Sequence, residues 1–299
     1  MKSYYIDVFV DEENNKNGGN PCLVYTGAEC LDKTQMQSLA QEAQKQYGGI
    51  ETAFILPPQK SNNDYMFMYF APLKEMEMCV HASIAALSVL EIESGNFHDS
   101  TLMKTYKIET KLGIFEMGYN SSTNQGYVLQ NSPQILNCIS SSAEVADALN
   151  ITNSTINQEL PIQNISTSRP KLIVPIQNVE FLDNLQPNFN QLWKLCDTYH
   201  TSGLYPFAFS DDFAHSKTLF ARQFPNNSGY NEDSATGVAA SALACYIASH
   251  CHILRKGWQS FIIKQGIAMG KPSKIIASVN FADEKIIKTK ISGKVAIRD

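Results

Sequence analysis

Met68-Tyr69-Phe70-Ala71-Pro72, an acidic loop, and then Cys79-Val80-His81-Ala82-Ser83-Ile84-Ala85-Ala86-Leu87 form the stretch that indicates the fold. It reads as a strand, a polar loop and a helix rich in alanine and serine. Small side chains allow a helix to lie deep inside a shell of strands. The N–H groups of its first turn are free to hold an anion. We therefore predict a central helix surrounded by strands.

A second stretch later in the chain has the same order. Ala221-Arg222-Gln223-Phe224-Pro225 precedes an acidic loop, and Glu232-Asp233-Ser234-Ala235-Thr236-Gly237-Val238-Ala239-Ala240 leads into a second small-residue helix. Gly49 and Gly203, Phe70 and Phe224, and Cys79 and Asp233 are all separated by the same number of positions. Repetition at a constant offset indicates two lobes of one design. Two such helix starts facing one cleft would bind a small carboxylate.

Hydrophobic patterns predict the elements around both stretches. In the first half, a helix capped by Asp32 or Thr34 stops at Gly48-Gly49 and precedes a strand over 51–56. In the second half, a helix around 192–199 stops at Gly203 and precedes a strand over 204–209. Further strands are expected at 4–10, 21–25, 66–70, 126–129, 171–176, 218–224 and 260–263. Many strands and few helices predict an α+β fold dominated by antiparallel sheet.

The polar stretch 119–125 is the expected boundary between the lobes. We predict an N-terminal lobe of residues 1–119, completed by a last strand at about 288–299. The C-terminal lobe then comprises residues 120–287.

Composition limits the expected partners. A net charge of −5 gives no basic footprint, so we expect neither nucleic acid nor a membrane surface as a partner. The polar N-terminus does not resemble a signal peptide, and the apolar run 238–248 is far shorter than the roughly 20 residues that span a bilayer. Seven cysteines without a C-x-x-C pair suit reduced thiols. We expect a cytoplasmic protein without a metal site or a nucleotide-cofactor motif.

Several further motifs occur in order along the whole chain. They are Gly19-Asn20-Pro21, Glu51-Thr52-Ala53-Phe54, Phe70-Ala71-Pro72 through Glu75, Cys79-x-His81-Ala82, Glu232-Asp233-x-Ala235-Thr236-Gly237, and Gln265-Gly266 with Gly270-Lys271-Pro272. This series resembles the PhzF-like family, the phenazine-biosynthesis isomerase and its relatives. The resemblance implies a diaminopimelate-epimerase-type fold, with two pseudo-symmetric lobes that each wrap a mainly antiparallel sheet or open barrel around a central helix. It also implies an active site between the lobes.

The resemblance further implies a cofactor-free, homodimeric enzyme that moves a proton on a small carboxylic acid. Glu51 opens a strand just after the Gly-Gly stop. A partly desolvated carboxylate there could take and return a proton near neutral pH. The alternative is a solvated glutamate at a strand end. In the family, this glutamate is the general base.

His81 and Asp233 are the other two candidate catalytic residues. His81 lies in the first turn of its helix, where the helix dipole should keep the imidazole neutral and suited to relay a proton. Alternatively, it is a buried structural histidine. Asp233 is expected at the head of the second helix, where a carboxylate is also a good N-cap. The resemblance implies that both residues take part, whereas Glu232 is expected to be structural or solvated.

Cys79 raises the question of thiol chemistry. In thiol-based epimerases of this fold, one cysteine in each lobe deprotonates the substrate carbon. Cys79 matches the first of these positions, but Ser234 lies near the second, and a hydroxyl is a much weaker base than a thiolate. We therefore expect Cys79 to be a small residue beside the site and disfavour a two-thiol racemase.

The remaining candidate residues would contact the substrate. Backbone amides near Val80, His81, Gly237 and Val238 are expected to bind its carboxylate, with Thr236 beside them. Asn20 is either a turn residue or an amide that reaches the substrate.

Relatives commonly have Gly at Val80, Pro at Ser234, Ser at Val238 and Arg at Lys271, so the family resemblance does not identify the substrate.

We expect a cofactor-independent isomerase with Glu51 as general acid/base and preorganised amides that stabilise developing charge. The alternatives are an amino-acid epimerase or racemase, a proton-abstracting lyase, and a catalytically silent ligand-binding or interaction module.

Overall fold

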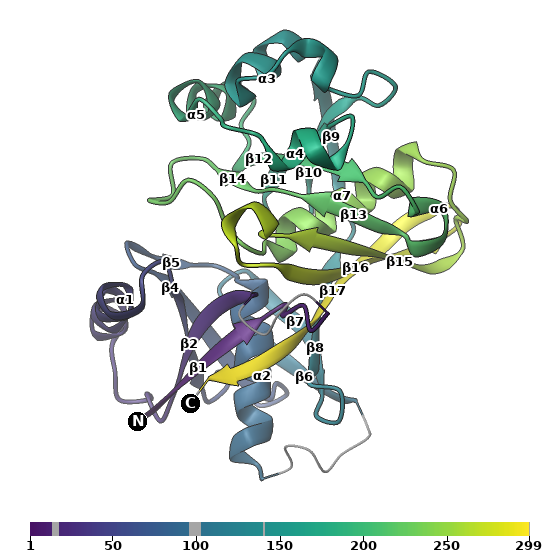
Figure 1. Cartoon of the computed structure of the whole chain (residues 1–299). Helices are drawn as coiled ribbons and strands as arrows, with labels where there is room; N and C mark the ends of the chain where they lie inside the picture. The colour runs from purple at the N-terminus through teal and green to yellow at the C-terminus, as the bar shows by residue number, and fades with distance from the viewer. Residues whose placement is uncertain (14–17, 96–102, 140, 299) are drawn as a thin grey trace. The chain divides into compact units, whose positions relative to one another are not determined.

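The computed structural model describes residues 1–13, 18–95, 103–139 and 141–298 (Figure 1). It divides into two compact units. Unit 1 comprises Met1 to Leu129 together with the segment from Ser292 onward, and unit 2 comprises Gln130 to Ile291. Among the described residues, no helix is long and apolar enough to cross a membrane.

Unit 1 is built from strands and two helices. Its elements are β1 (Lys2–Val8), β2 (Asn20–Thr26), α1 (Lys33–Tyr47), β3 (Glu51–Leu56), β4 (Tyr65–Ala71), β5 (Lys74–Met76), α2 (Val80–Glu93), β6 (Lys104–Thr110), β7 (Gly113–Asn120), most of β8 (Gln125–Asn131) and the second half of β17 (Lys285–Arg298). The strands β2 and β3 pair in parallel, as do β4 and β6. The pairs β1–β2, β3–β4, β6–β7, β7–β8 and β1–β17 are antiparallel.

The strand β17 pairs with both β1 and β8, so the pairings of unit 1 close into a ring. The helix α2 contacts β1, β2, β3, β4 and β7, and Figure 1 shows it running along these strands. Every residue from Val80 to Glu91 is buried. Alanine and serine make this burial possible because they let strands approach the helix from several sides.

The helix α1 packs against β3 and β4 of unit 1. It begins with a capping box, in which Asp32 accepts from the Gln35 N–H and Gln35 accepts from the Asp32 N–H. Its residues Met36 and Ala40 join a hydrophobic cluster that includes Phe54. The start of α1 at Asp32 and the strand β3 after the helix agree with the sequence prediction.

Unit 2 repeats the design with more helices. Its elements are β9 (Gln134–Ile139), α3 (Ser142–Leu149), η1 (Asn153–Thr155), β10 (Ile162–Ser166), β11 (Pro170–Pro175), α4 (Val179–Asp183), α5 (Phe189–Thr198), β12 (Gly203–Phe209), α6 (Phe213–Ser216), β13 (Thr218–Ala221), β14 (Phe224–Pro225), α7 (Gly237–His250), β15 (Gly257–Gln265), η2 (Ile267–Met269), β16 (Ser273–Ala282) and the first half of β17.

The strand pairings of unit 2 match those of unit 1 one by one. Parallel β11–β12 and β13–β15 correspond to β2–β3 and β4–β6. Antiparallel β10–β11, β12–β13 and β15–β16 correspond to β1–β2, β3–β4 and β6–β7. The helix α7 contacts β10, β11, β15 and β16, as α2 contacts the strands of unit 1. This repeat confirms the predicted α+β fold of two lobes, each with a central helix.

The strand predicted over 218–224 is wrong in one respect. The strand β13 ends at Ala221, and pairing with β12 resumes only at Phe224 in β14. The register against β12 is the same on both sides of this gap, and the Arg222 N–H donates to Pro206 O at 3.0 Å. The ladder is interrupted because Pro206 has no N–H to donate in return. On its other edge, Gln223 forms a bridge with Asp233, and this pairing is important for the site of unit 2.

Candidate active site

Glu51 occupies the first position of β3, directly after the turn that ends α1. Gly48 and Gly49 both have positive φ, at 69° and 57°, a conformation that glycine adopts without strain. The turn brings Glu51 opposite Cys22 of the parallel neighbour β2. The Glu51 side chain is only 13% exposed, so it is not the solvated glutamate of the alternative reading.

His81 is the second residue of α2 and lies between two other candidate residues. Its Nε2 atom is 3.5 Å from Glu51 Oε2, and its Nδ1 atom is 3.3 Å from Cys79 Sγ. The Nε2 atom has no hydrogen-bond partner in the part of the chain that the structure describes, because the Glu51 contact is an ion-pair distance without hydrogen-bond geometry. The imidazole is therefore held on one side by a thiol and approached on the other by a carboxylate.

The pKa of His81 is shifted in the direction opposite to the one that its helix position predicts. Burial acts to lower the imidazole pKa, but Cys79 beside Nδ1 and Glu51 beside Nε2 raise it more, and the pKa lies well above its usual value. A helix N-terminus alone predicts a neutral ring. The prediction of a neutral imidazole missed both neighbours, since they approach the ring from outside the helix.

Asn20, Val80 and Cys22 complete the surroundings in unit 1. Asn20 opens β2 and is buried, and Val80 is the buried first residue of α2. Gly19 precedes Asn20 with a φ of 94°, and a Cβ there would lie 2.7 Å from Val8 O, so this turn requires glycine. Burial raises the pKa of Cys22, with contributions from Cys79 and Glu51. Cys22 is not among the residues predicted from the sequence, because its proximity to Glu51 follows only from the β2–β3 register.

The candidate residues of unit 2 gather before α7. The N-cap of α7 is Thr236, not Asp233, and no side chain caps the helix start. The prediction of Asp233 as N-cap was therefore wrong, because the bridge to Gln223 holds it in the preceding loop. The Thr236 hydroxyl donates to Asp233 Oδ2. Gly237 and Val238 form the first turn, where N–H groups are available to an anion.

Gln265 organises this loop and was not assigned a role from the sequence. Its Nε2 donates to Asp233 O at 2.8 Å, and Tyr205 donates through its hydroxyl to Gln265 Oε1 at 2.8 Å. The Thr236 N–H donates to the same oxygen at 3.3 Å. The Gln265-Gly266 motif was the available signal. Its glycine has a φ of 78°, and a Cβ there would lie 2.7 Å from Ser234 O.

The Arg222–Glu232 pair fixes the acidic loop from the other side. Arg222 donates through Nε and Nη2 to the two carboxylate oxygens of Glu232, each at 2.8 Å. Both side chains are largely buried. Glu232 is thus a structural residue, as predicted.

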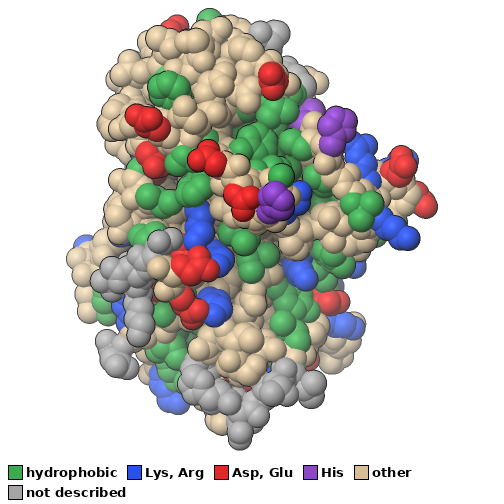
Figure 2. Space-filling model, turned by 45° about the vertical axis from the view of Figure 1, so that its right-hand side comes forward, with side chains coloured by type: hydrophobic (Ala, Val, Ile, Leu, Met, Phe, Trp, Pro, Cys, Tyr) green, Lys and Arg blue, Asp and Glu red, His purple; other side chains and the backbone are tan. Residues whose placement is uncertain are grey.

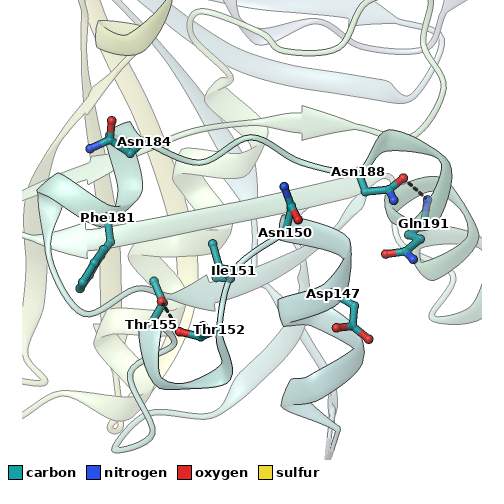
Figure 3. Close-up of a pocket in the computed structure, with 9 residues that line it drawn as sticks. All are labelled: Asp147, Asn150, Ile151, Thr152, Thr155, Phe181, Asn184, Asn188 and Gln191. Atoms are coloured by element: carbon teal, nitrogen blue, oxygen red, sulfur yellow. Dashed lines mark hydrogen bonds between the residues drawn. The ribbon is translucent and has the colours of Figure 1, made fainter.

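A pocket of unit 2 lies away from the candidate residues. It has a volume of about 780 Å³ and is lined by Asp147, Asn150, Ile151, Thr152, Thr155, Phe181, Asn184, Asn188 and Gln191 (Figure 3). Asn188 accepts from the Gln191 N–H, and the hydroxyls of Thr152 and Thr155 bond each other. The Asn188 side chain caps α5, and none of the candidate residues lines the pocket. On the face shown in Figure 2, acidic and basic side chains are interspersed rather than gathered by sign.

Comparisons with known proteins agree with this fold. The model of a family described as phenazine biosynthesis-like protein matches residues 6–298. An uncharacterised isomerase of Clostridium acetobutylicum is 30% identical, over 98% of this chain and 95% of the relative. The trans-2,3-dihydro-3-hydroxyanthranilate isomerase of Pseudomonas fluorescens is 26% identical, over 92% and 90%. A crystal structure of a PhzF-family protein from Bacillus anthracis superposes with a TM-score of 0.85 at 24% identity, over 100% and 98% of the two chains.

The fold of two repeated lobes and the relatives named for isomerisation place the protein in the isomerase class. The chain belongs to the phenazine biosynthesis-like family, a family of isomerases. The resemblance inferred from its ordered motifs is confirmed.

Proposed function

We propose that this protein is a cofactor-independent isomerase that moves a proton on a small carboxylic acid, with Glu51 as the general acid/base. The observation that carries the proposal is the 3.5 Å approach of Glu51 Oε2 to His81 Nε2, with side chains only 13% and 8% exposed. At this distance a small movement of either side chain brings the carboxylate and the imidazole into hydrogen-bond contact, so that a proton can pass between them in the proposed reaction. The two residues are held by different elements, β3 and α2, so the pair is set by the fold.

In the proposed reaction, Glu51 takes a proton from a carbon next to an unsaturated or carbonyl group. The electron pair of the broken C–H bond moves into that group, and a proton is then returned at another carbon. The substrate gains and loses no atoms. His81 hydrogen-bonds the substrate or relays the proton. The backbone N–H groups at Val80 and His81 stabilise the negative charge while it is on the substrate.

Unit 2 would supply substrate binding. We assign orientation of the substrate to Asp233 and carboxylate binding to the N–H groups of Gly237 and Val238, with Thr236 holding Asp233. Gln265 supports this assignment, since it ties the loop containing Asp233 to β15 through partly buried hydrogen bonds. The relative from Pseudomonas fluorescens is named for trans-2,3-dihydro-3-hydroxyanthranilate, and this compound is the first substrate to test.

One observation favours an amino-acid epimerase or racemase as the second candidate. Cys79 Sγ lies 3.3 Å from His81 Nδ1, and an adjacent imidazole can activate a thiol. Ser234, at the expected position of the second thiol, is buried and offers only a hydroxyl. An epimerase would invert a stereocentre, and Cys79→Ser would abolish that inversion.

The test is deuterium incorporation in D₂O. The protein is incubated with small unsaturated carboxylic acids, including trans-2,3-dihydro-3-hydroxyanthranilate, and substrate masses are recorded. Wild type should add a deuteron to a substrate, Glu51→Gln should lower the rate at least ~100-fold, and the exposed carboxylate variant Glu116→Gln should match wild type. Exchange by Glu51→Gln at the wild-type rate would refute the assignment of the base. Absence of any exchange by wild type would favour a binding module.

We also propose, from the family resemblance, that the protein forms a homodimer. Sedimentation velocity tests this directly: a single species with the mass of one chain across micromolar concentrations would contradict it.

A further inference from the structure

Gln223 has a buried side-chain amide without a hydrogen-bond partner among the described residues. It lies between β13 and β14, and its side chain is buried, with a residue exposure of 1%. Neither Nε2 nor Oε1 has a hydrogen-bond partner in the described part of the chain. Burying an amide without partners costs free energy, so such groups are uncommon in folded proteins. A buried water or a ligand group can supply the missing partner, and the position of the amide decides between them.

The strand pairing shows which way this amide faces. Gln223 and Asp233 are opposed in an antiparallel bridge, and the Asp233 N–H donates to Gln223 O at 3.1 Å. Side chains of opposed residues lie on the same side of the pair, with Cβ atoms about 4.5–5.5 Å apart. The preceding residues, Arg222 and Glu232, bond each other on the other side. Gln223 therefore faces the side on which Asp233 lies.

The surroundings leave room for the amide and keep its environment polar. A Cβ at Gly203 would lie 2.5 Å from Gln223 Nε2, so the glycine, with its φ of 150°, makes space for the side chain. Next to it, Lys171 Nζ is 3.5 Å from Ser202 O. Burial lowers the pKa of Lys171 to about 8, while the charge of Asp233 opposes that change. The buried Lys171 amine thus lies within range of the Asp233 charge, and Asp233 is the bridge partner of Gln223.

We infer that Gln223 is a specificity-determining residue whose amide hydrogen-bonds a hydroxyl group of the substrate beside Asp233. A hydroxyl is the matching group because it both donates and accepts, so it can pair with Oε1 or with Nε2. A site with a buried polar group discriminates against an analogue that lacks the partner, since the group is then left unpaired. The inference rests on the proposed function and deepens it: the substrate is a hydroxylated small carboxylic acid.

The experiment compares pairs of carboxylic acids that differ by one hydroxyl. Malate and succinate, 3-hydroxyanthranilate and anthranilate, and 4-hydroxyproline and proline are titrated by ligand-observed NMR. Wild type should bind the hydroxylated member of at least one pair about ten-fold more tightly, the size of one hydrogen bond. Gln223→Met, which keeps the length of the side chain, should lose that preference. Equal binding of both members by wild type in all pairs, or an unchanged preference in Gln223→Met, would overturn the inference.

Gln130→Met is the matched control. Gln130 lies on β8, is buried, and likewise has no partner for either amide atom within the described residues. It should keep the wild-type preference, and loss of the preference in this variant as well would overturn the inference. Thermal unfolding gives a second readout. Replacing an unpaired buried amide with methionine should keep or raise the Tm, so a marked fall confined to Gln223→Met would show a structural amide and also overturn it.

Glu51→Gln separates this inference from the proposed function. That variant should lose deuterium exchange and keep the hydroxyl preference. If Gln223→Met leaves the preference intact while Glu51→Gln still blocks exchange, only the role of Gln223 fails. If Glu51→Gln exchanges normally while Gln223→Met loses the preference, the assignment of the base fails and the specificity role stands.

Discussion

Arg222 donates two parallel hydrogen bonds of 2.8 Å to the carboxylate of Glu232. Its third nitrogen, Nη1, donates to the backbone carbonyls of Leu182, Asp183 and Leu185. One guanidinium thus ties three segments of unit 2 together. Because Glu232 directly precedes Asp233, the Arg222–Glu232 pair also fixes where the loop turns toward Gln223. The position of Asp233 depends on a salt bridge that does not include it.

Arg222→Lys should destabilise the protein and disturb this loop. A lysine keeps the positive charge but cannot form the two-pronged contact or reach the three carbonyls, so the loss of these hydrogen bonds should cost roughly 1–3 kcal/mol. Urea unfolding measures the loss. Lys33→Gln, which breaks the partly exposed pair with Glu75, is the control and should cost under about 1 kcal/mol. Equal effects of the two variants would contradict a special role for Arg222.

Glu51→Gln should lower the pKa of His81. The Glu51 carboxylate stabilises the imidazolium, so a neutral amide at the same place removes part of the upward shift. A raised pKa means that the imidazolium contributes stability below about pH 6.5, which is lost as pH rises through the folded-state pKa. NMR titration of the His81 ring protons checks the direction. An unchanged pKa would show that Cys79 alone sets the charge of the ring.

Lys171→Met should stabilise the protein most at neutral pH. The pKa of Lys171 is lowered from 10.5 to about 8, so folding with a charged lysine carries a cost below pH 8. Between about pH 8 and pH 10.5 the unfolded chain binds more protons than the folded chain, so the stability of the wild type rises with pH in this range. Removing the amine should add roughly 2–3 kcal/mol at pH 7, a gain that shrinks to nothing near pH 10.5. Lys194→Met, at an exposed position of α5, should show no such trend.

Gly266→Ala should cost more than Gly270→Ala, although both glycines have positive φ. At Gly266, a Cβ would lie 2.2 Å from Lys271 O and 2.7 Å from Ser234 O, both backbone atoms that cannot yield easily. At Gly270, nothing lies within 4 Å. We expect about 1–2 kcal/mol for Gly270→Ala from conformation alone and at least about 2 kcal/mol more for Gly266→Ala. Chemical denaturation of the two variants gives the comparison.

Local pattern was sufficient to predict the two central helices and the repeated order of elements. The small residues that follow Val80 and Gly237 predict α2 and α7, because such residues are typical of a helix enclosed by strands. The grouping of Glu51 with His81 was expected from the resemblance, and the structure brings them to 3.5 Å. Their catalytic role stays a prediction.

Long-range pairing accounts for what sequence reasoning missed. Asp233 looked like a helix cap because it precedes a helix, but its bridge to Gln223 is set by chain geometry ten positions away. Cys22 approaches Glu51 only through a parallel register, and Gln265 reaches Asp233 from a different strand. No spacing along the chain encodes such contacts.

The strand β17 has a consequence for how the molecule is made. Its last residues pair with β1, at the opposite end of the chain, as in the pairing of Val8 with Val295. During synthesis β1 is made before β17, so the edge of β1 that pairs with β17 stays unpaired until β17 has been translated. The other strands of unit 2 and α7 are translated before β17. The lobe that carries Glu51 and His81 is therefore begun before unit 2 and is completed after most of it.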